Sequence, residues 1–217
     1  MLLLFSCSKS DSPVVPPSTT VSDIDGHNYA LVTIGTQCWT QTNLNVSKYR
    51  NGDVIPQVND AAQWASLTTG AWCYYQYNSA NGTDYGKLYN WYAVHDARGL
   101  APTGYHVPSD AEWNTLIWFL GGEGVAGTKM KATTLWTWSD PIYGPLATNS
   151  SGFTAFPGGY CNYNGSFNTI SQFAYWWSSS ESSTAEAWCR TVSYSNFVAN
   201  RDYHYKTRGF SVRCLRD

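Results

Sequence analysis

Charged residues are scarce in this 217-residue chain, because Asp, Glu, Lys and Arg together make up only 13% of it, about half the share usual for globular domains. The formal net charge is −2, and neither sign forms a long run. A nucleic-acid partner would need a basic stripe that neutralises phosphates, and a polybasic membrane contact would need clustered Lys and Arg. The sequence therefore excludes nucleic acid and a polybasic membrane surface as partners.

Long apolar segments are also missing, since none approaches the roughly 20 residues needed to span a bilayer. The chain does begin with the apolar run Met1–Phe5, followed by Ser6 and Cys7. This pattern resembles the end of a bacterial lipoprotein signal, whose cysteine is acylated and becomes the new N-terminus. The run is shorter than a complete signal, which an upstream start codon would explain. The alternative is a chance hydrophobic start with an ordinary thiol.

These features predict three parts of the chain. Residues 1–7 are the partial signal, with Cys7 as the lipid anchor. Residues 8–22 are rich in Ser, Thr and Pro and form a semi-stiff tether. Residues 23–217 form one domain, because the remaining length suits a single core. The expected location is the cell envelope, as a surface-exposed outer-membrane lipoprotein that contacts the membrane through its lipid.

The six cysteines include no C-x-x-C pair of the kind found in zinc ribbons or redox motifs. Without the acylated Cys7, the chain keeps Cys38, Cys73, Cys161, Cys189 and Cys214. This odd number leaves at least one thiol unpaired, and export favours one or two disulfides. Spacing alone does not choose among the pairings, although we favour Cys161 with Cys189 in the C-terminal third.

Helical periodicity is concentrated in two segments. Residues 85–97 carry apolar and aromatic side chains at helical spacing. In the second segment, Ser109 and Glu112 form a capping box, and the apolar face that follows ends at Gly121. A shorter helix is expected over residues 60–67. With short strands and long Gly-, Ser- and Tyr-rich loops elsewhere, the pattern predicts an α+β fold whose two ends share a sheet.

Several blocks, in one order, carry a family resemblance. They are IGTQCW (34–39), YGKLYNWYA (85–93), PTGYHVPSDAEW (102–113), GFTAFPGGY (152–160), WWSS (176–179) and GFSVRC (209–214). Over residues 23–217 the chain resembles the Fibrobacter succinogenes major paralogous domain family. The resemblance implies a bacterial lipoprotein with a C-type lectin-like fold: two main helices, short antiparallel strands and long irregular loops. The family often has a cysteine before Pro-Thr-Gly that is expected to bridge to Cys214; here Ala101 takes that place.

Enzymatic motifs are not found. Residues 108–113 and 209–214 also resemble the formylglycine-generating sulfatase-modifying enzymes, but the close cysteine pair that holds copper there is missing. The four histidines occur without H-E-x-x-H, and G-x-S-x-G is absent. The calcium-binding tripeptides of C-type lectins are absent as well. We therefore expect a non-catalytic domain without cofactor or metal; a degenerate enzyme of that type, or a structural component of a surface assembly, is the alternative.

Aromatic residues, in contrast, reach 16% of the chain. In the C-terminal third they stand among polar residues, which suits stacking on sugar rings and hydrogen bonding to hydroxyls. The predicted ligand-binding residues are Trp176, Trp177, Glu181, Tyr194, Asn196, Arg201, Asp202 and Tyr203. The expected ligand is a glycan or a partner protein. The structural alternative is that Trp176 and Trp177 alternate across a core strand and that Arg201 and Asp202 form an ion pair.

Overall fold

The computed structural model describes residues 19–137 and 147–217. The predicted signal, its Cys7 and most of the tether lie outside the described residues. Strand and bridge residues make up 31% of the described part and helices 19%, so the domain is mostly β. In this part of the chain, no helix has the length and hydropathy needed to cross a membrane.

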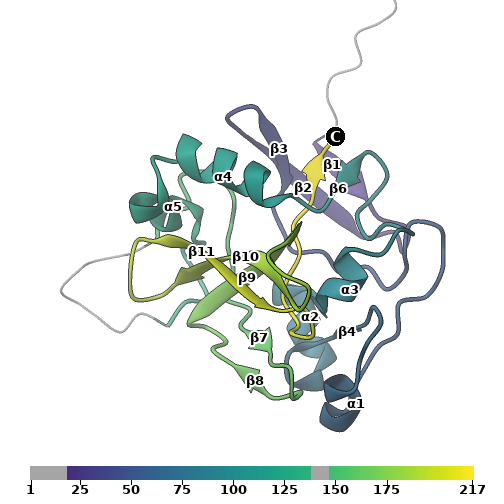
Figure 1. Ribbon diagram of the computed structural model, residues 1–217. Helices are drawn as coiled ribbons and strands as arrows, with labels where there is room; N and C mark the ends of the chain where they lie inside the picture. The colour runs from purple at the N-terminus through teal and green to yellow at the C-terminus, as the bar shows by residue number, and fades with distance from the viewer. Residues whose placement is uncertain (1–18, 138–146) are drawn as a thin grey trace, which may run out of the picture.

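A five-stranded antiparallel sheet joins both ends of the described chain (Figure 1). Its strands, in spatial order, are β1 (Thr20–Ser22), β2 (Asn28–Ile34), β3 (Gln37–Thr40), β12 (Leu215–Arg216) and β6 (Tyr105–His106). Leu215 pairs with Trp39 on one side and with His106 on the other. The prediction that the two ends share a sheet is confirmed.

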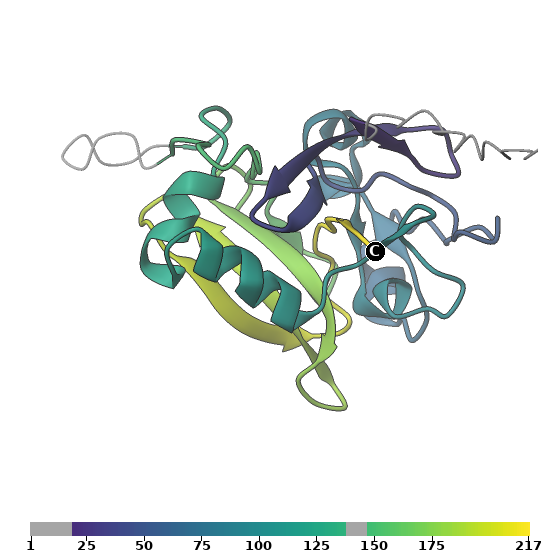
Figure 2. The same cartoon turned by 90° about the horizontal axis from the view of Figure 1, so that it is seen from above.

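A three-stranded antiparallel sheet forms the second main layer. It comprises β9 (Phe173–Glu181), β10 (Glu186–Ser193) and β11 (Ala199–Tyr205), with β10 in the centre. Helices α4 (Asp110–Phe119) and α5 (Glu123–Met130) lie against one face of this sheet (Figure 2). The other face packs on the shorter elements.

The shorter elements lie around the second face. They are α1 (Ala61–Ala65), β4 (Trp72–Cys73), α2 (Gly82–Tyr85), β5 (Leu88–Tyr89), α3 (Trp91–Val94), β7 (Tyr160–Cys161), β8 (Phe167–Asn168) and two single-turn 3₁₀ helices, Tyr75–Tyr77 and Ser79–Asn81. Strand β4 pairs with β5, and β7 pairs with β8.

The predicted α+β, C-type lectin-like fold with two main helices is wrong: the chain forms curled β-sheet with several short helices. The helix expected over residues 85–97 shrinks to the four residues of α3. Gly86, at φ +70°, interrupts the backbone, and the N–H of Tyr89 donates instead to the carbonyl of Phe210. Pairing with a distant segment therefore overrides the local helical pattern.

Helix α4, the other predicted helix, begins where its cap was expected. The Ser109 side chain accepts from the Glu112 N–H, and the Glu112 carboxylate accepts from the Ser109 N–H. The helix buries Trp113, Leu116 and Ile117. Because all these signals lie within a dozen residues, no distant contact was needed to predict them.

The core lies on both sides of the three-stranded sheet. Trp176 points into the cluster beneath α4, where the Trp113 ring centroid lies 4.7 Å from that of Trp39. Its neighbour Trp177 points into the cluster on the other face, against Phe210 at 4.3 Å. Both tryptophans are fully buried. The structural alternative for this pair, alternation across a core strand, is confirmed.

Gly127 on α5 is the position of closest approach between that helix and the chain entering β11. A Cβ atom here would lie 2.5 Å from the carbonyl oxygen of Val198 and 2.7 Å from that of Phe197. We expect Gly127→Ala to lower the free energy of unfolding by about 1–3 kcal/mol, because backbone must move. Gly124→Ala on the same helix meets no atom within 4 Å and should raise it by up to about 1 kcal/mol. Equal urea midpoints for the two variants would contradict this packing.

Candidate functional site

The predicted ligand-binding residues do not form one site. Trp176 and Trp177 offer no ring face to solvent, since both are 0% exposed. Tyr194 and Asn196 belong to the turn between β10 and β11. Tyr194 packs against the core beneath the helices, and the Asn196 carbonyl accepts from the buried Lys131 Nζ at 2.6 Å. These four residues serve the core and the turn.

The remaining four residues lie at the end of β9 and on both faces of β11. Arg201 and Tyr203 point to the face that carries α4 and α5, whereas Asp202 points to the opposite face, 3.4 Å from His204 Nε2. Glu181 ends β9 and pairs with Lys206 at 2.6 Å. The expected ion pair between Arg201 and Asp202 is therefore wrong; only Arg201 and Tyr203 share a surface.

That surface carries a row of three aromatic rings, which we call the aromatic strip: the half-buried Trp188 and the exposed Tyr203 and Tyr205. Tyr203 and Tyr205 are each 50% exposed. Trp188 on β10 lies directly across from Tyr203, with ring centroids 5.6 Å apart and planes at 88°. Tyr163, from the β7–β8 turn, extends the row with its ring 6.1 Å from that of Tyr205.

The sequence prediction missed Trp188 and Tyr205. The signal that could have found them is the alternation of side chains along a strand, which places residues 201, 203 and 205 on one face. Antiparallel register then puts Trp188 beside Tyr203 and Glu186 beside Tyr205. This register could not be read from either strand alone, so the strip becomes visible only when the strands are paired.

At the end of the strip near α4, Arg201 is held in place by Asp110. The Arg201 Nε donates to both Asp110 carboxylate oxygens, at 3.0 and 2.9 Å. Its guanidinium carbon then lies 3.3 Å from the centroid of the Trp188 ring, a close cation–π contact. One face of the indole is thus covered by a charged group whose position is fixed.

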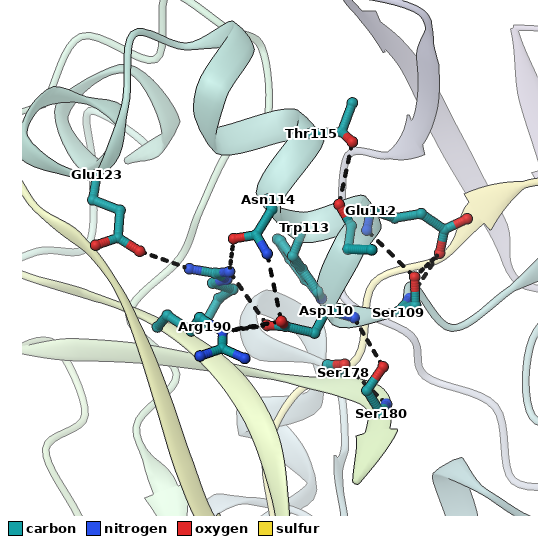
Figure 3. A network of polar contacts seen from close by, with 12 residues as sticks. Ser109, Asp110, Glu112, Trp113, Asn114, Thr115, Glu123, Ser178, Ser180 and Arg190 are labelled. Carbon is teal, nitrogen blue, oxygen red and sulfur yellow. Dashed lines mark hydrogen bonds and ion pairs between the residues drawn. The ribbon is translucent and has the colours of Figure 1, made fainter. Parts of the chain in front are cut away.

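Asp110 also binds a second, buried arginine (Figure 3). The Arg190 guanidinium, 1% exposed, contacts Asp110 at 3.3 Å, Glu123 at 3.2 Å and the side-chain oxygen of Asn114. Burial lowers the pKa of Arg190, and the two carboxylates offset part of that shift. Asp110 is the first residue of α4, where a negative charge also complements the helix dipole.

A family model, the Fibrobacter succinogenes major domain, matches residues 32–216. The chain belongs to this family. Comparison with curated proteins and with solved structures finds no match. The blocks that carried the resemblance now have positions in the fold. Residues 102–113 form β6 and the start of α4, and residues 176–179 lie in β9. The aromatic strip lies outside all the blocks.

In this Fibrobacter succinogenes major domain, His106 lies between two carboxylates. Its Nδ1 is 2.7 Å from Asp217 and its Nε2 is 2.9 Å from Glu112. Burial lowers the pKa of His106, but the hydrogen bonds to the two carboxylates raise it by more, so the net shift of this pKa is upward. Glu112, whose other oxygen accepts from Ser109, has a lowered pKa although burial acts in the opposite direction. Within residues 19–137 and 147–217, no group of three His, Cys, Asp or Glu residues could hold a metal ion.

The raised pKa of His106 predicts a pH-dependent stability. Its contribution is fully present below the ordinary pKa of 6.5 and is lost as the pH rises through the higher folded-state pKa. The imidazole is 37% exposed and Asp217 58% exposed, so the contribution is at most about 1 kcal/mol. We expect His106→Asn to be less stable than the parent at pH 6 and equal to it at pH 9, as measured by urea unfolding. A difference that stays constant with pH would contradict this assignment.

Proposed function

We propose that this chain is a non-catalytic cell-surface lipoprotein that binds a glycan at the aromatic strip. Sugar rings present C–H groups that pack on aromatic faces, and their hydroxyls need fixed hydrogen-bond partners. Tyr203 and Tyr205 supply exposed rings, and Arg201 and Glu186 lie beside them on the same sheet face. The low charge of the chain suits a neutral polar ligand.

The observation that carries this proposal is the exposure of large rings in a row on a sheet. Most tryptophans among the described residues are buried, including Trp39, Trp64, Trp113, Trp176 and Trp177 at 0% exposed. Tyr203 and Tyr205 keep half of their surface in water, and contiguous exposed apolar surface commonly marks a binding site. The location of the strip outside the family blocks fits a surface that sets the ligand of this particular member.

The direct test is a glycan array probed with the full chain carrying Cys7→Ser, which cannot be acylated. We expect a defined set of oligosaccharides to bind, and binding to be lost in Tyr203→Ala with Tyr205→Ala. Phe197→Ala is the matched control, because Phe197 is 43% exposed in the turn at the far end of the hairpin. An array without any bound glycan, or equal loss in the control, would overturn the proposed site.

Lipid attachment is tested separately. Cells expressing the chain from its natural start are fed an alkyne fatty acid, and the protein is recovered and tagged. We expect label on the parent chain, no label on Cys7→Ser, and membrane-fraction recovery of the parent only. Removal of the parent by protease added to whole cells would support surface exposure. Label that persists in Cys7→Ser would contradict the assignment of the anchor.

A protein partner is the second candidate, and one observation favours it. Trp118 and Phe119 near the end of α4 are 76% and 63% exposed, on a part of the helix away from its buried face. Neighbouring exposed aromatics of this kind are enriched at protein interfaces. If this surface binds a protein, pull-down from the cell envelope should recover a partner with the parent chain and none with Trp118→Ser. A structural role in a surface assembly requires the same result.

A further inference from the structure

Two buried cysteines from distant parts of the sequence lie in the same small core cluster. Cys73 ends β4 and Cys161 ends β7. Both are 0% exposed and share the cluster with Trp64, Leu88 and Tyr75. Both carry free thiols in the structure. Their strands belong to different two-stranded sheets, β4 with β5 and β7 with β8. The pair therefore lies where these two small sheets meet.

The two thiols are neighbours in this cluster. They are within hydrogen-bonding reach, and the pKa of Cys73 is raised by its burial first and by the hydrogen bond to Cys161 second. Backbone bridges also hold both strands beside the same segment of chain. Tyr89, the last residue of β5, pairs with Phe210, and Cys161, the last residue of β7, pairs with Gly209. A Cβ atom on Gly209 would lie 3.0 Å from the Cys161 Cβ, which shows how little free space surrounds this thiol.

The other cysteines lie elsewhere in the described structure. Cys189 and Cys214 belong to the larger cluster against Trp177 and Phe210, and Cys38 is half-buried on β3. Cys161 and Cys189, the pair that the sequence favoured, therefore lie in different clusters. The structure gives Cys161 a different neighbour, Cys73.

We infer that Cys73 and Cys161 form a disulfide bond in the exported protein, an inference that rests on the proposed export. Each thiol gives up one proton and one electron as the S–S bond forms. The two electrons and two protons pass to the disulfide of an oxidised thiol–disulfide oxidoreductase, which leaves as a dithiol. Because both sulfurs are buried in the folded domain, the bond forms before the cluster closes, and reductants do not reach it afterwards.

The consequence is a covalent link between the β4–β5 and β7–β8 hairpins. It closes a long loop of chain, and loop closure of that size removes much of the freedom of the unfolded state. We expect the oxidised chain to melt about 10 °C above the same chain after reduction in denaturant. The thiols of Cys38, Cys189 and Cys214 stay free.

The test uses the full chain carrying Cys7→Ser, so that it does not depend on export. The reduced, denatured chain is refolded in a glutathione redox buffer, alkylated with N-ethylmaleimide in denaturant and digested without reductant. Mass spectrometry should find one linked peptide pair, containing Cys73 and Cys161, with the other three cysteines alkylated. Cys189→Ser should keep the link, whereas Cys73→Ser should leave Cys161 alkylated.

Two results would overturn the inference: all five cysteines alkylated after refolding to the native state, or a link that involves another cysteine. The same digest of protein recovered from the cell envelope separates this inference from the proposed export. Envelope protein with free Cys73 and Cys161 would contradict the disulfide and leave the lipoprotein assignment intact. A chain found only in the cytoplasm, but correctly linked after refolding, would contradict the export alone.

Discussion

Replacing Arg213 with methionine is expected to lower the free energy of unfolding by about 3–5 kcal/mol. The guanidinium is fully buried and donates four hydrogen bonds of 2.7–2.8 Å. The acceptors are the Asn43 side chain and the carbonyls of Thr40, Phe153 and Thr154. Methionine fills the volume but leaves the carbonyls of Thr40, Phe153 and Thr154 without their Arg213 donor, and each such loss in the core is costly. The Asn43 oxygen still accepts from Trp176 Nε1 at 2.9 Å.

The control for Arg213→Met is Arg98→Met. Arg98 binds two carboxylates, Asp53 and Asp96, but it is 41% exposed, so its loss should cost less than about 1 kcal/mol. Urea unfolding of both variants, followed by tryptophan fluorescence, measures the difference. A loss below about 1 kcal/mol for Arg213→Met would show that Arg213 does not organise the two segments it contacts, residues 40–43 and 153–154.

Asp110→Ala is expected to cost about 3 kcal/mol and also to disturb the aromatic strip. The substitution removes the most buried carboxylate that contacts Arg190, whose guanidinium then stays in the protein interior with less compensation. It also releases Arg201 from its position over Trp188. Stability and ligand binding should therefore fall together, because one carboxylate serves both arginines.

Glu123→Ala is the matched control for Asp110→Ala. Glu123 contacts the same Arg190 at 3.2 Å but is 54% exposed, so water screens most of its interaction. We expect a loss of less than about 1 kcal/mol and unchanged ligand binding. Equal losses in the two variants would mean that burial of Asp110 does not determine its contribution.

The sequence predicted the local features of this fold and missed those that depend on distant pairing. The capping box at Ser109 and Glu112 identified α4 because cap and apolar face lie close together in the sequence. Residues 85–97 carry an equally helical spacing, yet most of that segment is not helical, since Tyr89 bonds to Phe210. Local spacing contains no information about the partner strand.

The candidate site shows the same division. Of the eight residues predicted from the sequence, Arg201 and Tyr203 lie on one accessible face of β11, whereas Asp202 between them points to the other face. Trp176 and Trp177 look equally suitable for stacking, but both faces of β9 are covered in the structure. Which faces of a strand are covered depends on helices and loops that come from elsewhere in the chain. The disulfide partner of Cys161 could not be predicted from spacing for the same reason.

A binding titration tests directly whether the aromatic strip holds a glycan. An oligosaccharide selected on the array is titrated calorimetrically into the Cys7→Ser chain and into the same chain with Tyr203→Ala. Loss of an exposed aromatic anchor is expected to cost at least about 1.4 kcal/mol, so the Kd should be about 10-fold higher or more. An unchanged Kd for Tyr203→Ala, with the fold intact, would contradict glycan binding at the strip.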